Sequence, residues 1–235
     1  QSSRVYVIRN IILQGSNPVR DLGVLIDETL SYKQHIMSIV NKAMQRVGVL
    51  FRGFVCRDLQ FLRRAFITYI RPILEFNCVI WSPTTKKYID LLERVQRKFT
   101  KRIPCLQSMT YLERLNCINL RSLELRRLHS DLIYYYKIIH GLTPIDPEVF
   151  FTFHIPPVSL RRSTPFIQKP LNASVLLLST FANRSVTCWN NLSDDVRDFS
   201  SLPAFKRTII NLDFNSFLYG SCFSNLYNFN MSILS

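Results

Sequence analysis

The spacing of apolar positions changes near residue 32. Before that point, the runs RVYVIRNIIL (residues 4–13) and VRDLGVLID (residues 19–27) are short and rich in β-branched side chains, and the turn sequence GSNP separates them. From residue 32 to residue 55, apolar side chains recur three and four positions apart, as on one face of a helix: Ile36, Ile39, Val40, Ala43, Val47, Leu50 and Phe51. The pattern predicts a hairpin or small sheet followed by a helix.

The run YIRPILEFNCVIWSP (residues 69–83) is apolar but contains a proline. Asp58 is the predicted N-cap of the helix that leads into it. Pro72 has no amide hydrogen to donate to the preceding turn, so we expect the helix to bend there. Arg71 and Glu75 are four positions apart and are expected to pair across the bend. The run therefore predicts a kinked helix.

The next helix, from about residue 84 to residue 103, has one apolar and one cationic face. At 100° per residue, five apolar side chains fall within about 80° of one another: Tyr88, Leu92, Val95, Phe99 and Ile103. Four basic side chains fall on the other side, where we expect them to project together into solvent: Arg94, Arg97, Lys98 and Lys101. Two interpretations remain open, contact with nucleic-acid phosphates and an ordinary solvated helix face.

Three more basic residues lie near the ends of this predicted helix. The seven candidate nucleic-acid-binding side chains are Lys86, Lys87, Arg94, Arg97, Lys98, Lys101 and Arg102. Only Asp90 and Glu93 offset them in the sequence. The chain as a whole carries a net charge of +14, and residues 42–137 supply +12 of it, with 19 basic and 7 acidic side chains. This concentration predicts a polyanionic partner, nucleic acid before a membrane surface.

Two further helices are predicted before the chain becomes rich in proline. A short one covers residues 110–115, and a long one runs from about Arg121 to His140, with Gly141 as the residue that ends it. After Pro144 we expect irregular or extended chain with one or two short helices, one of them near residues 202–212. The predicted fold is mainly α, in three parts: a β element (1–31), a helical bundle (32–143) and a proline-rich irregular extension (144–235).

The composition agrees with a folded domain. Of the 235 residues, 47% are apolar, which is enough for a proper core, and only 6 are glycine, which argues against an all-β fold. No run of 18 uncharged apolar residues occurs, so we expect no membrane contact through a spanning helix. Because the sequence opens on Gln1 rather than Met, we expect a fragment or a cleaved product.

Neither a metal site nor a catalytic residue is predicted. Six cysteines form no Cys-x-x-Cys pair and most lie in apolar runs, so we expect buried free thiols in a reducing compartment. The doublet Asp194-Asp195 lies in NNLSDDVRDF, which is more typical of a helix start capped by Ser193 than of a carboxylate pair between strands. The four histidines are scattered, and no nucleophile and orienting acid accompany them in the sequence.

Five segments together resemble the C-terminal region of reverse transcriptases from non-LTR (LINE-type, jockey-like) retrotransposons. They are VRDLGVLID, LSYKQHI, YIRPILEFNCVIWSP, ERVQRKFTKRI and YLERLNCINLRSLELRRLHSDL, in the family's order and with similar gaps. A weaker likeness, CWNNL followed by SLPAFKR, is similar to the end of those reading frames. Phe76 stands where the family usually has tyrosine. The resemblance covers roughly residues 18–210.

The resemblance implies that the DLGV strand closes the palm of the polymerase and that the following helices form the thumb and its extension. A thumb of this kind grips the primer–template duplex, so the implied partners are RNA and DNA and the rest of the enzyme, in the cytoplasm and nucleus. The family's catalytic carboxylates, which use Mg²⁺, lie upstream and have no counterpart here, so no cofactor is expected in this fragment. We therefore expect no polymerase activity from it alone. The competing hypothesis is a non-catalytic protein-interaction or structural module, a domesticated or decayed relic.

Overall fold

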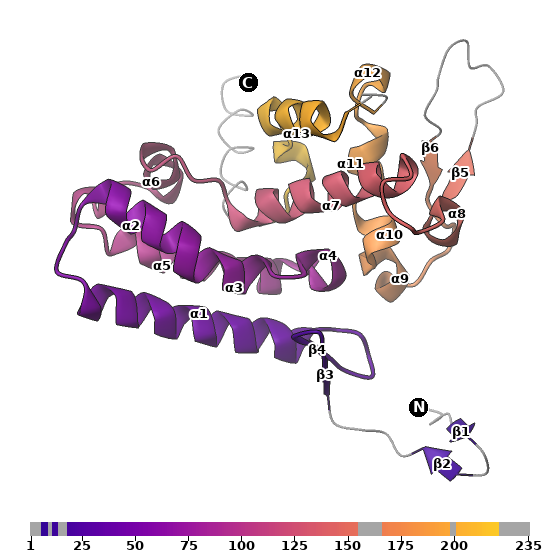
Figure 1. Ribbon diagram of the computed structural model, residues 1–235, viewed down its shortest axis with the longest axis horizontal. Coiled ribbons are helices and arrows are strands. Elements are labelled where there is room, and N and C mark those ends of the chain that lie inside the picture. Colours follow the sequence, from indigo (N-terminus) through magenta and orange to yellow (C-terminus); the bar gives the residue numbers. More distant parts are fainter. Residues whose placement is uncertain (1–5, 9–10, 14–17, 155–165, 198–200, 221–235) are drawn as a thin grey trace, which may run out of the picture.

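The computed structural model describes residues 6–8, 11–13, 18–154, 166–197 and 201–220. These residues form a mainly helical protein with small antiparallel hairpins, which confirms the predicted fold class (Figure 1). No helix among them is long and apolar enough to cross a membrane.

Two separate hairpins precede the helices. β1 (Tyr6–Ile8) pairs with β2 (Ile11–Leu13), and β3 (Val19–Asp21) pairs with β4 (Val24–Ile26). Each predicted run thus folds back on itself instead of pairing with the other. In the second hairpin the turn places Leu22 and Gly23 at positive φ, 41° and 88°.

The first helices follow the apolar pattern up to Pro72 and depart from it there. They are α1 (Lys33–Gly53), α2 (Leu59–Ala65), the π-helical turn η1 (Phe66–Ile70), α3 (Arg71–Glu75) and α4 (Cys78–Trp81). The Asp58 carboxylate accepts the amide of Phe61 at 2.7 Å, so the predicted N-cap is confirmed. Arg71 lies 3.7 Å from Glu75, as predicted.

The kinked helix predicted for residues 69–83 is wrong in its detail. The backbone widens into a π turn just before Pro72, which lies in the first turn of α3. The helix then ends at Glu75, and Phe76 and Asn77, the latter at φ 51°, separate it from the single turn α4. The Trp81 indole nitrogen donates to the carbonyl of Phe76 at 2.8 Å, a hydrogen bond that spans the break between α3 and α4.

The central helices are those that the sequence predicts. They are α5 (Lys86–Lys101), the 3₁₀ turn η2 (Pro104–Leu106), α6 (Tyr111–Cys117) and α7 (Leu123–Ile139). Thr110 and Glu113 form a reciprocal capping box at the start of α6. Gly141 follows α7 at φ 65°, the conformation in which glycine ends helices.

The chain after residue 144 contains more helix than the one or two short helices predicted. Its elements are α8 (Pro147–Phe150), β5 (Thr152–His154), β6 (Phe166–Gln168), α9 (Val175–Ser179), α10 (Phe181–Arg184), α11 (Val186–Asn190), α12 (Asp194–Arg197), α13 (Leu202–Asn211) and η3 (Asn215–Phe217). Serine caps begin several of them, as Ser174 and Ser201 do. β5 and β6 pair as an antiparallel hairpin.

Helix α7 lies between helices α3–α5 and helix α13 (Figure 1) and contributes to two hydrophobic clusters. The first joins α1 to α6 and reaches the start of α7, with Phe66, Trp81 and Phe99 among its largest buried side chains. The second packs Tyr135 and other residues of α7 against the C-terminal helices. The predicted bundle and the C-terminal extension therefore share α7.

Candidate nucleic-acid interface

The apolar face of α5 anchors this helix in the first cluster. Leu92, Val95 and Phe99 are fully buried, as the sequence predicts. The ring of Phe99 lies 4.8 Å from that of Phe66 and 5.4 Å from that of Phe51, measured between centroids. Tyr88 is only half-buried. Helix α1 and the π turn η1 thus hold one side of α5.

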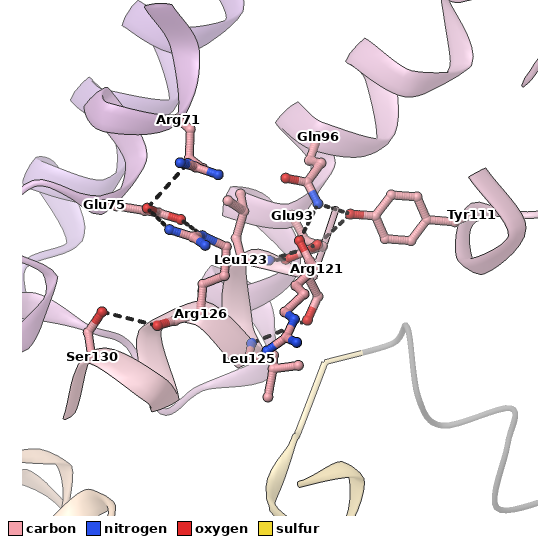
Figure 2. A network of polar contacts seen from close by, with 11 residues as sticks. Arg71, Glu75, Glu93, Gln96, Tyr111, Arg121, Leu123, Leu125, Arg126 and Ser130 are labelled. Atoms are coloured by element: carbon pink, nitrogen blue, oxygen red, sulfur yellow. Dashed lines mark hydrogen bonds and ion pairs between the residues drawn. The ribbon is translucent and has the colours of Figure 1, made fainter. Parts of the chain in front are cut away.

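A polar layer holds a second side of α5 (Figure 2). Glu93 and Gln96 are each 1% exposed. The Tyr111 hydroxyl donates to Glu93, and the Leu123 amide donates to the same carboxylate at 3.0 and 3.2 Å. Gln96 donates to the carbonyl of Arg121 at 2.9 Å. These contacts fix α5 against α6 and against the beginning of α7.

This layer also changes the charge balance that the sequence suggests. Burial raises the pKa of Glu93 above its ordinary value, because the charged form loses its hydration. A carboxylate buried in this way does not offset cations on the opposite, solvent-facing part of the helix. The sequence gives no direct sign of it, because Tyr111 and Leu123 are 18 and 30 residues away.

What remains exposed on α5 is a row of cations, here called the basic stripe: Lys87, Arg94, Lys98 and Lys101. At 100° per residue these four positions fall within about 60° of one another. None of them has an ion-pair partner among the residues that the structure describes. Lys86 and Arg102 are exposed at the two ends of the helix, and the Arg102 guanidinium lies 4.4 Å from the centroid of the Phe51 ring.

Arg97 does not project with the stripe. Its side chain is 31% exposed, its Nη2 atom lies 3.9 Å from Oδ1 of Asp90, and its guanidinium lies 5.1 Å from the centroid of the Tyr111 ring. The helical rotation that places Arg97 beside Asp90 also turns it toward α6. The expectation that Arg94, Arg97, Lys98 and Lys101 face solvent together therefore holds for three of the four.

A second set of exposed cations lies on α1, which the sequence reasoning missed: Lys33, Lys42, Arg46 and Arg52. The sequence does indicate a basic segment here, because no acidic residue lies between Glu28 and Asp58. Because helical spacing spreads these cations around α1, they form no single row.

The other polar candidates take structural positions. Asp194 and Asp195 lie in the first turn of α12, where Asp194 accepts a hydrogen bond from Arg197 and the Ser193 carbonyl receives two amides. His140 stacks on Tyr136, with ring centroids 4.1 Å apart. Among the described residues, no group of three or more His, Cys, Asp or Glu side chains could hold a metal ion.

The prediction of buried cysteines is wrong for three of the five that the structure describes. Cys78 and Cys188 are buried, whereas Cys56, Cys105 and Cys117 are exposed, and all five are free thiols. The exposed three lie in a connection, a 3₁₀ turn and the last turn of a helix, where an apolar neighbour in the sequence does not ensure burial. Cys222 lies outside the described residues.

One curated relative matches over most of the chain. Over 154 residues, 64% of this chain and 73% of the relative, the sequence is 27% identical to the uncharacterized protein B0403.1 of Caenorhabditis elegans. No protein-family model matches the chain, and no solved structure matches it.

Proposed function

We propose that this chain is the C-terminal, thumb-like region of a non-LTR retrotransposon reverse transcriptase and that α5 binds the primer–template duplex. The observation that carries the proposal is the basic stripe, four exposed cations on a helix whose other sides are fixed by the core. The order of the five sequence segments supports the choice of enzyme family. The chemistry belongs to the upstream palm, so the fragment is expected to incorporate no nucleotides by itself.

The stripe has suitable dimensions for contact with a nucleic-acid backbone. From Lys87 to Lys101 the helix rises about 21 Å at 1.5 Å per residue. Long, flexible ammonium and guanidinium side chains along such a row contact phosphates, which carry no sequence information. Binding is therefore expected to depend strongly on salt and weakly on base sequence.

A second candidate function rests on a different surface. The apolar side chains of Phe150 in α8 and of Val175 and Leu176 in α9 are exposed. They line a cavity of about 730 Å³ whose wall also includes residues of α4, α7 and α10. Exposed apolar patches are typical of protein-interaction sites. On this reading the chain is a protein-interaction module, and the stripe is only solvated.

Binding of an RNA–DNA hybrid duplex, followed by fluorescence anisotropy, separates the two candidates. Changing Lys98 and Lys101 together to Gln removes two stripe charges, whereas Lys206→Gln with Arg207→Gln removes two exposed charges from α13. The first pair is expected to weaken binding by about tenfold or more, and the second by much less. Equal weakening, or no duplex binding at all, would favour the interaction module.

A further inference from the structure

The short helix α9 presents its apolar side chains to solvent. Val175, Leu176, Leu177 and Leu178 are 80%, 47%, 43% and 40% exposed, and no residue of this helix is buried. The segment around it, residues 170–183, contains no charged side chain, although 20% of the whole chain is charged. Exposed apolar patches of this kind are typical of interaction sites.

Two cavities lie beside α9, which Figure 1 shows at the outer edge of the C-terminal helices. Val175 and Leu176 line the larger one, of about 730 Å³. Leu177, at the next position of the helix, lines a second one of about 360 Å³, and Phe150 of α8 lines both. The helix is therefore an apolar ridge with a hollow on each side.

The exposed apolar side chains on the walls of these cavities are here called the α9 surface: Ile80, Phe150, Leu171, Val175, Leu176 and Leu177. Together they expose roughly 700 Å² per copy of the chain, so two such surfaces reach the about 1,200 to 2,000 Å² that specific protein–protein interfaces bury. The α9 surface is therefore large enough to hold two copies together.

Charge also favours a second copy at this surface. A chain with a net charge of +14 repels another copy of itself over most of its surface. Among the described residues, the walls of the two cavities include one lysine each, Lys33 and Lys169, and no carboxylate. Asp146 and Glu148, exposed at the start of α8, offset these two charges. Two copies can therefore meet at α9 with little repulsion.

We propose that two copies of this chain associate through the α9 surface about a twofold axis, with α9 of each copy in the larger cavity of the other. In such a contact one surface meets itself, so it needs both a protruding part and a hollow part. The α9 surface has both. The inference names a partner for the surface of the second candidate function, and it holds whether or not α5 binds a duplex.

Sedimentation equilibrium of the full chain at about 1 to 100 μM measures this association. The mass is expected to rise with concentration from that of one chain to that of two and to stop there, because a twofold contact closes. Higher salt is expected to tighten the dimer, because it screens the repulsion between two positive chains, whereas it weakens duplex binding. A mass of one chain throughout would mean that another molecule covers the α9 surface, and it would overturn the proposal.

Variants link the association to α9. Val175→Lys places a charge at an exposed position, so the chain should still fold, and the dissociation constant of the dimer should rise by about tenfold or more. The matched control is Val55→Lys, which adds the same charge at a valine that is 91% exposed between α1 and α2 and should leave the constant unchanged. Lys98→Gln with Lys101→Gln should not weaken the dimer, which separates this inference from duplex binding by the stripe. Equal weakening by the two valine variants, or a dimer that dissociates as salt rises, would overturn the proposal.

Discussion

The Tyr111 hydroxyl of α6 donates a hydrogen bond to the buried Glu93 carboxylate of α5 (Figure 2). This contact and the Leu123 amide fix the rotation of α5 about its own axis. Because Glu93 points inward, Arg94 and Lys98 point outward. A buried carboxylate thus sets the direction of the exposed cations.

The first prediction concerns the pH dependence of stability through Glu93. Its pKa in the folded protein is raised by burial above the ordinary 4.5, so the folded state holds this proton more tightly than the unfolded state does. The resulting stabilisation is complete below about pH 4.5 and is lost as pH rises through the raised pKa. Relative to Glu93→Gln, the wild type should therefore lose stability as pH rises above 4.5, as measured by urea unfolding at each pH.

Glu113 provides a control of opposite sign. Hydrogen bonds from the Thr110 backbone and side chain lower the pKa of this exposed carboxylate. Its stabilisation is present above the ordinary pKa and is lost as pH falls through the lowered value. The free energy of unfolding of the wild type minus that of Glu113→Gln should therefore rise with pH. If the same difference taken with Glu93→Gln also rose with pH, the description of Glu93 as a buried carboxyl group would be wrong.

The second prediction concerns the join between α7 and the C-terminal helices. Asp131 accepts two hydrogen bonds from Arg184, at 2.6 and 2.8 Å, and the two side chains are 4% and 5% exposed. Asp131→Ala leaves the guanidinium buried without its carboxylate partner, which should lower the free energy of unfolding by about 3 to 5 kcal/mol. Chemical denaturation of the wild type and of the variant measures this difference in the free energy of unfolding.

The matched control for that variant is Glu28→Ala, which removes an exposed acid. It should change the free energy of unfolding by less than about 0.5 kcal/mol. Indistinguishable stabilities of Asp131→Ala and Glu28→Ala would show that α7 and α10 are not joined as described.

The third prediction concerns thiol reactivity. Burial raises the pKa of Cys188 to about 12 and also raises that of Cys78, whereas Cys56, Cys105 and Cys117 are exposed. Because the thiolate is the reactive form, N-ethylmaleimide should modify the exposed three in the folded protein and the buried two only after unfolding. Peptide mass spectrometry on a Cys222→Ser background measures this. Modification of Cys188 as fast as of Cys117 in folded protein would contradict it.

The parts of the fold that the sequence predicts depend on local chemistry. Asp58 begins α2 and Gly141 follows α7, both as predicted, and α6 forms where a short helix is predicted, with a Thr110–Glu113 box at its start. A cap needs only its own turn, so neighbouring residues are enough to identify it. The apolar face of α5 is likewise a property of one helix.

The parts that the sequence does not predict depend on distant partners. A helical wheel places Glu93 and Arg97 on a polar face, but α6 packs beside both and buries one of them. The larger cavity beside α9 is lined by residues of α4, α7, α8 and α10 as well, so no single segment contains it. The break at Asn77 also depends on tertiary packing, since its side chain donates to the carbonyl of Leu22 at 3.4 Å.

The salt dependence of duplex binding tests the role of α5 most directly. For the wild-type chain, log affinity for a primer–template duplex should fall linearly with log salt. Lys98→Gln with Lys101→Gln should flatten that slope by about 1 to 2 units, because each phosphate that the protein neutralises adds about 0.9 to it, while Lys206→Gln with Arg207→Gln should leave it unchanged. Arg97→Gln should change it less than Lys98→Gln does, because Asp90 and Tyr111 already hold that guanidinium. Identical slopes for the wild type and a folded Lys98→Gln, Lys101→Gln variant would contradict the proposed interface.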